Sequence, residues 1–177
     1  MNKYSTVKDI GKKILILGCP GSGKTTLSLK LAESTHLPCY HLDDFFWKEG
    51  WIPVEENIFV KKIKEIVDRD QWILEGNYSG YLDIRLQKAD TVIYLEKPTI
   101  TCLWRVLKRA ISLKFFADSE STFPKKIVQG FLDNKNGISD DFFGFILFVL
   151  KFKKRERNKV LNELKEYPNL KVITYSS

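Results

Sequence analysis

Short apolar runs alternate along this chain with longer stretches in which apolar residues recur every three or four positions. Short runs bounded by turn residues are typical of buried parallel strands, and the longer periodic stretches are typical of amphipathic helices. The pattern predicts strands at 13–17, 38–42, 71–74, 91–95 and 171–175. It predicts helices at 24–34, 55–69, 82–88, 99–116 and 139–167. This alternation predicts an α/β fold in which helices cover both faces of a parallel sheet and ligands bind at the carboxyl ends of the strands.

One long segment interrupts the alternation. Between about 112 and 141, proline, glycine and asparagine are scattered among serine and lysine without a regular period. Long excursions of this kind are often lids over a binding site. The chain has 177 residues, which suits one domain with a full core. We therefore predict a single domain, 1–177, with a helical lid inserted near its middle.

A phosphate-binding motif stands between the first predicted strand and the first predicted helix. Residues 18–25 read G-x-x-x-x-G-K-T. Glycines let backbone N–H groups converge on phosphate oxygens, the lysine reaches the β and γ phosphates, and the threonine hydroxyl binds Mg²⁺. The helix that follows directs the positive end of its dipole at the same anion. We expect ATP and Mg²⁺ as ligands, with the phosphate cradle formed by Gly18, Pro20, Gly21, Ser22, Gly23, Lys24, Thr25 and Thr26.

Acidic residues follow the next two predicted strands. Asp43 and Asp44 come after the second strand, and Glu75 ends the third. Phosphoryl transfer to a hydroxyl group needs a carboxylate that accepts the proton. Asp43 is the first candidate for this base or for a water-mediated Mg²⁺ ligand, and Asp44 is the second; either residue could instead cap the following turn. Glu75 is a candidate for accepting hydrogen bonds from Mg²⁺-bound water; alternatively, it is an ordinary turn residue. The predicted metal set is Thr25, Asp43 and Glu75.

Arginines are the candidates for clamping the transferred phosphate, because a guanidinium can hold two phosphate oxygens at once. Arg85 follows Glu75 on a short predicted helix, and Arg105 and Arg109 share one face of the helix before the lid. We favour Arg85 and Arg109 as clamps. The predicted catalytic set is therefore Lys24, Asp43, Arg85 and Arg109.

Other residues near the acids allow two interpretations. Phe45, Phe46, Trp47 and Trp51 either stack on the ring of an acceptor or pack beneath a loop. His41 stands at the end of the second predicted strand, where we favour a packed or solvated role over catalysis.

Composition limits the partners. The net charge of +7 at pH 7 favours polyanions, but lysine-rich helix faces and a triphosphate site account for such an excess, and no nucleic-acid-binding motif supports nucleic acid as a partner. Three cysteines without metal-binding spacing favour a reduced, cytoplasmic protein. The most apolar run, 142–150, is about half of what a bilayer span needs, which favours a buried helix and no membrane partner.

Several short sequence words carry a more specific resemblance. The words LDDFFW (42–47), GW (50–51), WILEGNY (72–78), LDIRL (82–86) and ADT (89–91) occur in this order. Together with the P-loop, they resemble the bacterial P-loop DNA topology modulation proteins, which are themselves similar to adenylate kinase and other small nucleotide kinases. The resemblance runs from about 13 to 109 and continues weakly to the end of the chain.

The resemblance implies an adenylate-kinase-like, three-layer P-loop NTPase fold with a five-stranded parallel sheet in the order 2-3-1-4-5. It implies ATP on the P-loop, a lid over it, and a correspondence of Glu75 and Gly76 with the acidic residue and glycine that end the third strand in nucleotide kinases. The chain departs from the family in the lid. The family's lid is rich in arginine, whereas no arginine stands here between Arg109 and Arg155.

Two functions are compatible with these features. The first is an ATP- and Mg²⁺-dependent kinase of a small molecule such as a nucleoside, a nucleotide or a similarly sized metabolite. The acidic pair at 43–44 and the lack of arginine in the lid favour a hydroxyl group as phosphate acceptor, because a phosphate acceptor needs arginines more than a base. The second is a nucleotide-dependent switch that acts on DNA topology without kinase activity. The sequence does not indicate the oligomeric state.

Overall fold

Five parallel strands form one sheet at the centre of the protein. The computed structural model describes residues 10–48, 52–115 and 140–176. All neighbouring strands pair in parallel, in the order β2-β3-β1-β4-β5. This topology confirms the expected α/β fold class and strand order. The strands are β1 (Lys13–Gly18), β2 (Cys39–His41), β3 (Trp72–Glu75), β4 (Thr91–Glu96) and β5 (Lys171–Ser176).

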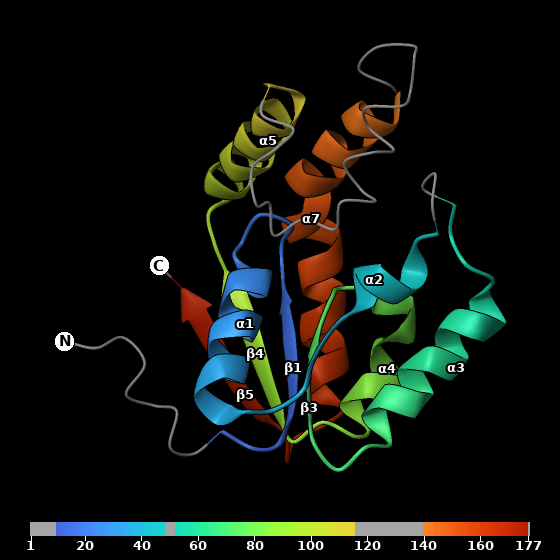
Figure 1. The fold of residues 1–177 in the computed structure, drawn as a ribbon. Coiled ribbons are helices and arrows are strands. Elements are labelled where there is room, and N and C mark those ends of the chain that lie inside the picture. Colours follow the sequence, from blue (N-terminus) through green and yellow to red (C-terminus); the bar gives the residue numbers. More distant parts are fainter. Residues whose placement is uncertain (1–9, 49–51, 116–139, 177) are drawn as a thin grey trace.

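Helices lie on both faces of this sheet and beyond its carboxyl edge. They are α1 (Lys24–Thr35), α2 (Leu42–Phe46), α3 (Glu56–Val67), the 3₁₀ turn η2 (Ser79–Tyr81), α4 (Leu82–Leu86), α5 (Thr99–Phe115) and α7 (Asp140–Lys165). In Figure 1, α1 covers one face, while α3, α4 and the second half of α7 lie on the other. The upper part of α7 and α5 rise side by side past the carboxyl edge of the sheet.

The alternation of side chains along the central strands builds two cores. Leu15 and Leu17 of β1 face the helices α3, α4 and α7, whereas Ile14 and Ile16 face α1. All four side chains are fully buried. Successive residues of a strand point to opposite faces, so an apolar strand with no polar alternation is stable only between two layers.

The structure differs from the sequence prediction around the second strand. β2 ends at His41, and the next residues form the short helix α2 rather than a turn. Asp43 and Asp44 therefore stand in the first turn of a helix, where the helix dipole favours negative charge. The predicted lid at 112–141 lies outside the described residues, except for its two ends, which belong to α5 and α7. None of the described helices is long and apolar enough to cross a membrane.

Candidate active site

The P-loop joins β1 to α1 at the carboxyl edge of the sheet. A Cβ atom on Gly18 would lie 2.6 Å from the carbonyl oxygen of Leu95, and one on Gly21 would lie 2.5 Å from the carbonyl oxygen of Cys102. Both glycines have positive φ angles, 146° and 82°, which other residues rarely adopt. Glycine at these positions therefore lets the loop pack directly against β4 and α5.

The start of α1 has unused hydrogen-bonding capacity. Gly23, its N-cap residue, offers the first turn no side-chain hydrogen bond. The hydroxyl of Ser22 is buried and has no partner among the described residues. Open helix N–H groups and unpartnered buried polar atoms suit an anion. The loop thus fits the phosphates of a nucleotide. Of the other cradle residues, Pro20 lies in the turn before α1 and Thr26 is exposed on its first turn.

Glu75, at the end of β3, lies at the centre of a polar cluster. Its Oε1 atom lies 3.8 Å from Lys24 Nζ, and its Oε2 atom accepts a hydrogen bond of 3.2 Å from the Thr25 hydroxyl. His41 Nδ1 lies 2.9 Å from Oε2. We call these four residues the Glu75 cluster. They meet because the parallel strands end at the same edge of the sheet.

The Glu75 carboxyl is ionised although it is buried. Burial alone would raise its pKa, but the hydrogen bond with His41 and the charge of Lys24 lower the pKa below its usual value. An ionised carboxylate next to the threonine hydroxyl of the P-loop supplies oxygen atoms of the kind that a hydrated Mg²⁺ prefers. Glu75 and Thr25 could therefore hold this metal.

His41 is a member of the cluster that the sequence pattern did not favour. Its hydrogen bonds with Cys39 and with Glu75 raise its pKa to about 10, against the opposing effect of burial. His41 is thus a cation at neutral pH. The sequence placed His41 near the end of a predicted strand, and the structure shows that this strand pairs with the strand ending in Glu75.

Replacing His41 by asparagine should destabilise the protein in a pH-dependent way. The folded-state pKa lies near 10, above the ordinary value of 6.5. The stabilisation is therefore complete below pH 6.5 and is lost as the pH rises from 6.5 to 10. We expect the variant to lose about 1–3 kcal/mol of unfolding free energy at pH 6 and clearly less at pH 10, measured by urea unfolding. His36→Asn, at an exposed position, is the matched control. An equal loss at all pH values would contradict this assignment.

Asp43 borders the Glu75 cluster and is held by a tyrosine. The Tyr78 hydroxyl donates a hydrogen bond of 2.6 Å to Asp43 Oδ1. Burial raises the pKa of Asp43, and the hydrogen bond from Tyr78 lowers it in part. The charges of Glu75 and Lys24 also act on this carboxyl. Asp44, one residue further, is exposed. A carboxylate with a raised pKa in a fixed orientation is suited to accept a proton.

The described aromatic residues near Asp43 pack against one another. The Phe46 ring lies 4.9 Å from that of Phe59 and 4.8 Å from that of Tyr78, between ring centroids. Lys62 Nζ lies 5.5 Å from the ring centroid of Phe45. These contacts join α2 to α3. They favour the interpretation that the aromatic residues pack against the protein over the one in which they stack on the ring of an acceptor. Trp51 lies outside the described residues.

The sequence predicted Arg85 as a phosphate clamp, but its guanidinium is buried against backbone carbonyls. Its side chain is fully buried in α4, and its N–H groups point at backbone carbonyls. Burial lowers its pKa. The guanidinium holds the segment after β3, which includes Asn77, whose Oδ1 accepts a hydrogen bond of 3.2 Å from the Gly18 N–H. Arg85 thus supports the P-loop from a distance. Its carbonyl partners belong to Gly76, Asn77, Tyr78 and Tyr81.

Replacing Arg85 by methionine should lower the unfolding free energy by about 2–3 kcal/mol, because several buried carbonyls would lose their donor. Arg155, an exposed residue of α7, provides the matched control: Arg155→Met should change the unfolding free energy by less than about 0.5 kcal/mol. Urea unfolding measures both changes. A loss in Arg85→Met no larger than in the control would contradict the structural role.

Two further arginines lie on α5, the helix that packs against the P-loop. Arg105 is exposed and donates a hydrogen bond of 3.4 Å to the carbonyl oxygen of Gly21. Arg109, one turn further, is half-buried; burial lowers its pKa, while the negative charge of Glu75 opposes this shift. Arg109 therefore lies within electrostatic reach of the Glu75 cluster. Arg105 thus lies at the predicted phosphate site, and Arg109 follows it one turn further along α5.

Comparison with known proteins agrees with this fold. A family model described as an AAA domain matches residues 14–122, more than half of the chain. The chain is similar in fold to shikimate kinase from Bacteroides thetaiotaomicron, with 15% identity, a TM-score of 0.53, and coverage of 90% of this chain and 84% of that one.

A sugar kinase from Janibacter sp. HTCC2649 is a weaker match, with 16% identity, a TM-score of 0.47, and coverage of 92% and 83%. No curated protein matches the chain. The extent of the family match, together with the strand order and the P-loop, leads to one conclusion: the chain belongs to the AAA domain family and has a P-loop kinase-like fold.

Proposed function

We propose that this protein is a kinase that transfers the γ-phosphate of ATP to a hydroxyl group of a small molecule. The observation that carries the proposal is the position of Asp43, a half-buried carboxylate held by Tyr78 beside the Glu75 cluster. A phosphate cradle and a base at one edge of the sheet are what phosphoryl transfer to a hydroxyl requires. The whole chain acts as one domain in this proposal.

Each residue has one task in the proposed reaction. Backbone N–H groups of the P-loop and the ammonium of Lys24 bind the phosphates, and Thr25 and Glu75 hold Mg²⁺, which neutralises phosphate charge when bound. Asp43 accepts the proton of the acceptor hydroxyl. Tyr78 orients Asp43 as a positioning residue. Arg109 adds positive charge where negative charge increases during transfer.

The charges around Asp43 favour a neutral acceptor over a phosphorylated one. Asp43 and Asp44 place two neighbouring carboxyl groups on this side of the site, and the guanidinium of Arg85 is already bonded to backbone carbonyls. Recognition of a second phosphate normally uses arginines with free donors. The described helices α2, α3 and α4 contain Asp43 as a base and one arginine, Arg85, whose donors are used by these carbonyls.

The proposal is tested by a screen of acceptors. Purified protein with Mg²⁺ and ATP is incubated with nucleosides, nucleotides, sugars and other small hydroxyl compounds, and ADP is measured with and without each compound. We expect acceptor-dependent ADP formation with at least one hydroxyl compound that carries no phosphate. ADP formation with nucleoside monophosphates alone would contradict the hydroxyl acceptor, and none with any acceptor would contradict the kinase.

A second candidate is a nucleotide-dependent regulator of DNA topology, as in the family that the sequence resembles. The net charge of +7 favours it. DNA binding by such a protein should weaken steeply with salt, because bound lysines and arginines release counterions from the DNA. Titration of a labelled duplex at several salt concentrations tests this function, and undetectable binding near physiological salt would exclude it.

A further inference from the structure

Two of the three cysteines lie together at the P-loop. Cys19 belongs to the loop and Cys102 to the first turn of α5, and both are buried. They share a small apolar cluster with residues of α7, and their thiols are hydrogen-bonded. The third cysteine, Cys39, lies on β2 at the far edge of the sheet and packs in a different core.

The pair holds a reactive form of sulfur at neutral pH. The hydrogen bond from Cys19 lowers the pKa of Cys102 to about 7, and the positive charges of Lys24, Arg105 and Lys97 act in the same direction, against burial. The same hydrogen bond and burial raise the pKa of Cys19. One thiolate paired with one thiol is therefore well populated, and the thiolate is the form that oxidants attack.

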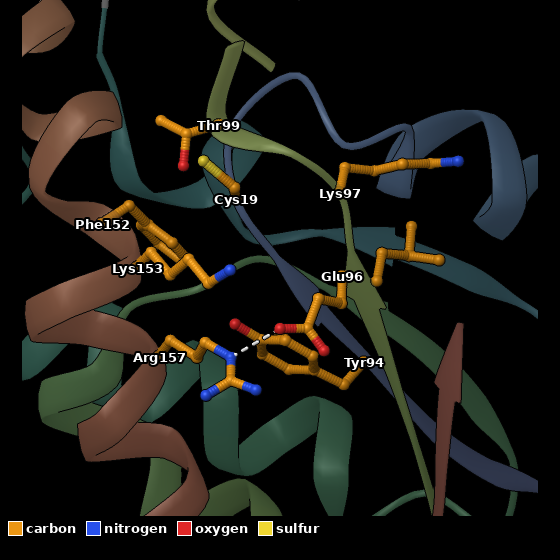
Figure 2. A pocket seen from close by; sticks show the side chains of 9 residues that line it. Cys19, Tyr94, Glu96, Lys97, Thr99, Phe152, Lys153 and Arg157 are labelled. Carbon is orange, nitrogen blue, oxygen red and sulfur yellow. Dashed lines mark hydrogen bonds and ion pairs between the residues drawn. The ribbon is translucent and has the colours of Figure 1, made fainter. Parts of the chain in front are cut away.

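A small pocket gives access to Cys19, one member of this pair. It lies between the end of β4, the start of α5 and the helix α7, and Cys19 lines it together with Lys97, Thr99 and Phe152. Figure 2 shows the Cys19 side chain pointing toward Thr99, opposite Phe152. A peroxide molecule is little larger than water, whereas a disulfide such as oxidised glutathione is far larger. The pocket favours the small oxidant.

We propose that hydrogen peroxide converts Cys19 and Cys102 into a reversible disulfide, and that this bond weakens nucleotide binding at the P-loop. The second part rests on the nucleotide site proposed above. Cys19, the sulfur that lines the pocket, passes its proton to the Cys102 thiolate and attacks one peroxide oxygen, the O–O bond breaks, and the released hydroxide takes that proton to leave as water. The other thiol then attacks the sulfenic acid formed, and a second water leaves as the S–S bond forms. Two thiols are oxidised by two electrons and one peroxide is reduced to two waters.

The bond would move the P-loop because no space is left for a closer approach. A disulfide joins the sulfurs at about 2.0 Å, much less than their separation in a hydrogen bond. Gly21 already contacts the backbone of Cys102, since a Cβ there would lie 2.5 Å from the Cys102 oxygen. We therefore expect the loop to shift when the two sulfurs are drawn together. Its Cys19 carbonyl accepts hydrogen bonds from Ser22 N at 3.0 Å and Lys24 Nζ at 3.4 Å, so both phosphate-binding residues would move with it.

The experiment compares the full chain in reduced, peroxide-treated and dithiothreitol-restored forms. Mass spectrometry of peptides, after free thiols are blocked, measures the Cys19–Cys102 link, and calorimetry measures the affinity for a non-hydrolysable ATP analogue. We expect the link in the treated form, at least tenfold weaker binding, and full recovery after reduction. Cys39→Ser should still form the link. Cys102→Ser, with Cys102→Ala if the first variant does not fold, should bind nucleotide equally with and without peroxide.

Two results would overturn the inference. One is the absence of the link, including irreversible oxidation of either cysteine alone. The other is a linked protein that binds the analogue as tightly as the reduced one. A reduced protein that binds no nucleotide would instead refute the proposed function, and the effect on affinity with it, while the mass measurement would still decide whether the disulfide forms.

Discussion

Replacing Lys24 by alanine should lower the rate of phosphoryl transfer by about 10³-fold, the upper range for loss of one charged group that stabilises a transition state. Lys24 is almost completely buried, at 9% exposure, and its ammonium lies 3.8 Å from Glu75 Oε1. It is therefore held at the P-loop, where no other described lysine replaces it. Acceptor-dependent ADP formation measures the change once the screen has identified an acceptor.

Lys30→Met is the matched control for this variant. Lys30 lies on the same helix, α1, but it is exposed and away from the loop. Its replacement removes the same charge and should leave turnover within about twofold. The fold of Lys24→Ala is checked by urea unfolding, since Glu75 keeps its contacts with Thr25 and His41. Turnover of the folded Lys24→Ala variant at the rate of the unchanged protein would contradict a role for the P-loop in catalysis.

Asp43→Asn should lower kcat by about 10²- to 10⁴-fold, the usual effect of removing a general base. Nucleotide affinity should stay within a few-fold, because Asp43 lies on α2 and not on the P-loop. Asp44→Asn is the matched control, since Asp44 is the next residue of the same helix and is exposed. Equal rates for Asp43→Asn and the unchanged protein would exclude Asp43 as the base.

The pH dependence of kcat is a second test of Asp43 as the base. A base must be deprotonated, so kcat should fall as the pH drops through the raised pKa of Asp43, above the ordinary aspartate value of 3.8. The Tyr78 hydrogen bond lowers this pKa. Tyr78→Phe should therefore shift the acidic limb of the profile to higher pH, while Asp43→Asn should remove the limb. A limb that did not move in Tyr78→Phe would show that another group titrates.

Much of the architecture could be predicted because it depends on local patterns. The apolar runs predicted each strand to within about two residues, and the reason is clearest for β1 and β3, which are buried between two helical layers. The P-loop was predicted for a similar reason: glycines at Gly18 and Gly21 are demanded by the backbone itself. The acidic strand ends could be placed at one edge because parallel strands all end there.

Side-chain partners could not be predicted in the same way. Arg85 was interpreted as a phosphate clamp, but the sequence contains no sign that the carbonyls after β3 turn inward and use its donors. His41 was interpreted as a packed or solvated residue, although it pairs with Glu75, 34 positions away. In both cases the partner is determined by the path of another segment, which no local period encodes.

The sequence by itself determined the layers, the phosphate cradle and the edge of the sheet where the chemistry would be found, because periodicity and motif spacing act within a few residues of one another. Only the tertiary structure decided which side chains act together: Glu75 with Lys24 and His41, Asp43 with Tyr78, and Cys19 of the P-loop with Cys102. These contacts join residues that are far apart in the chain, and they form only when the sheet brings the ends of its strands to one edge.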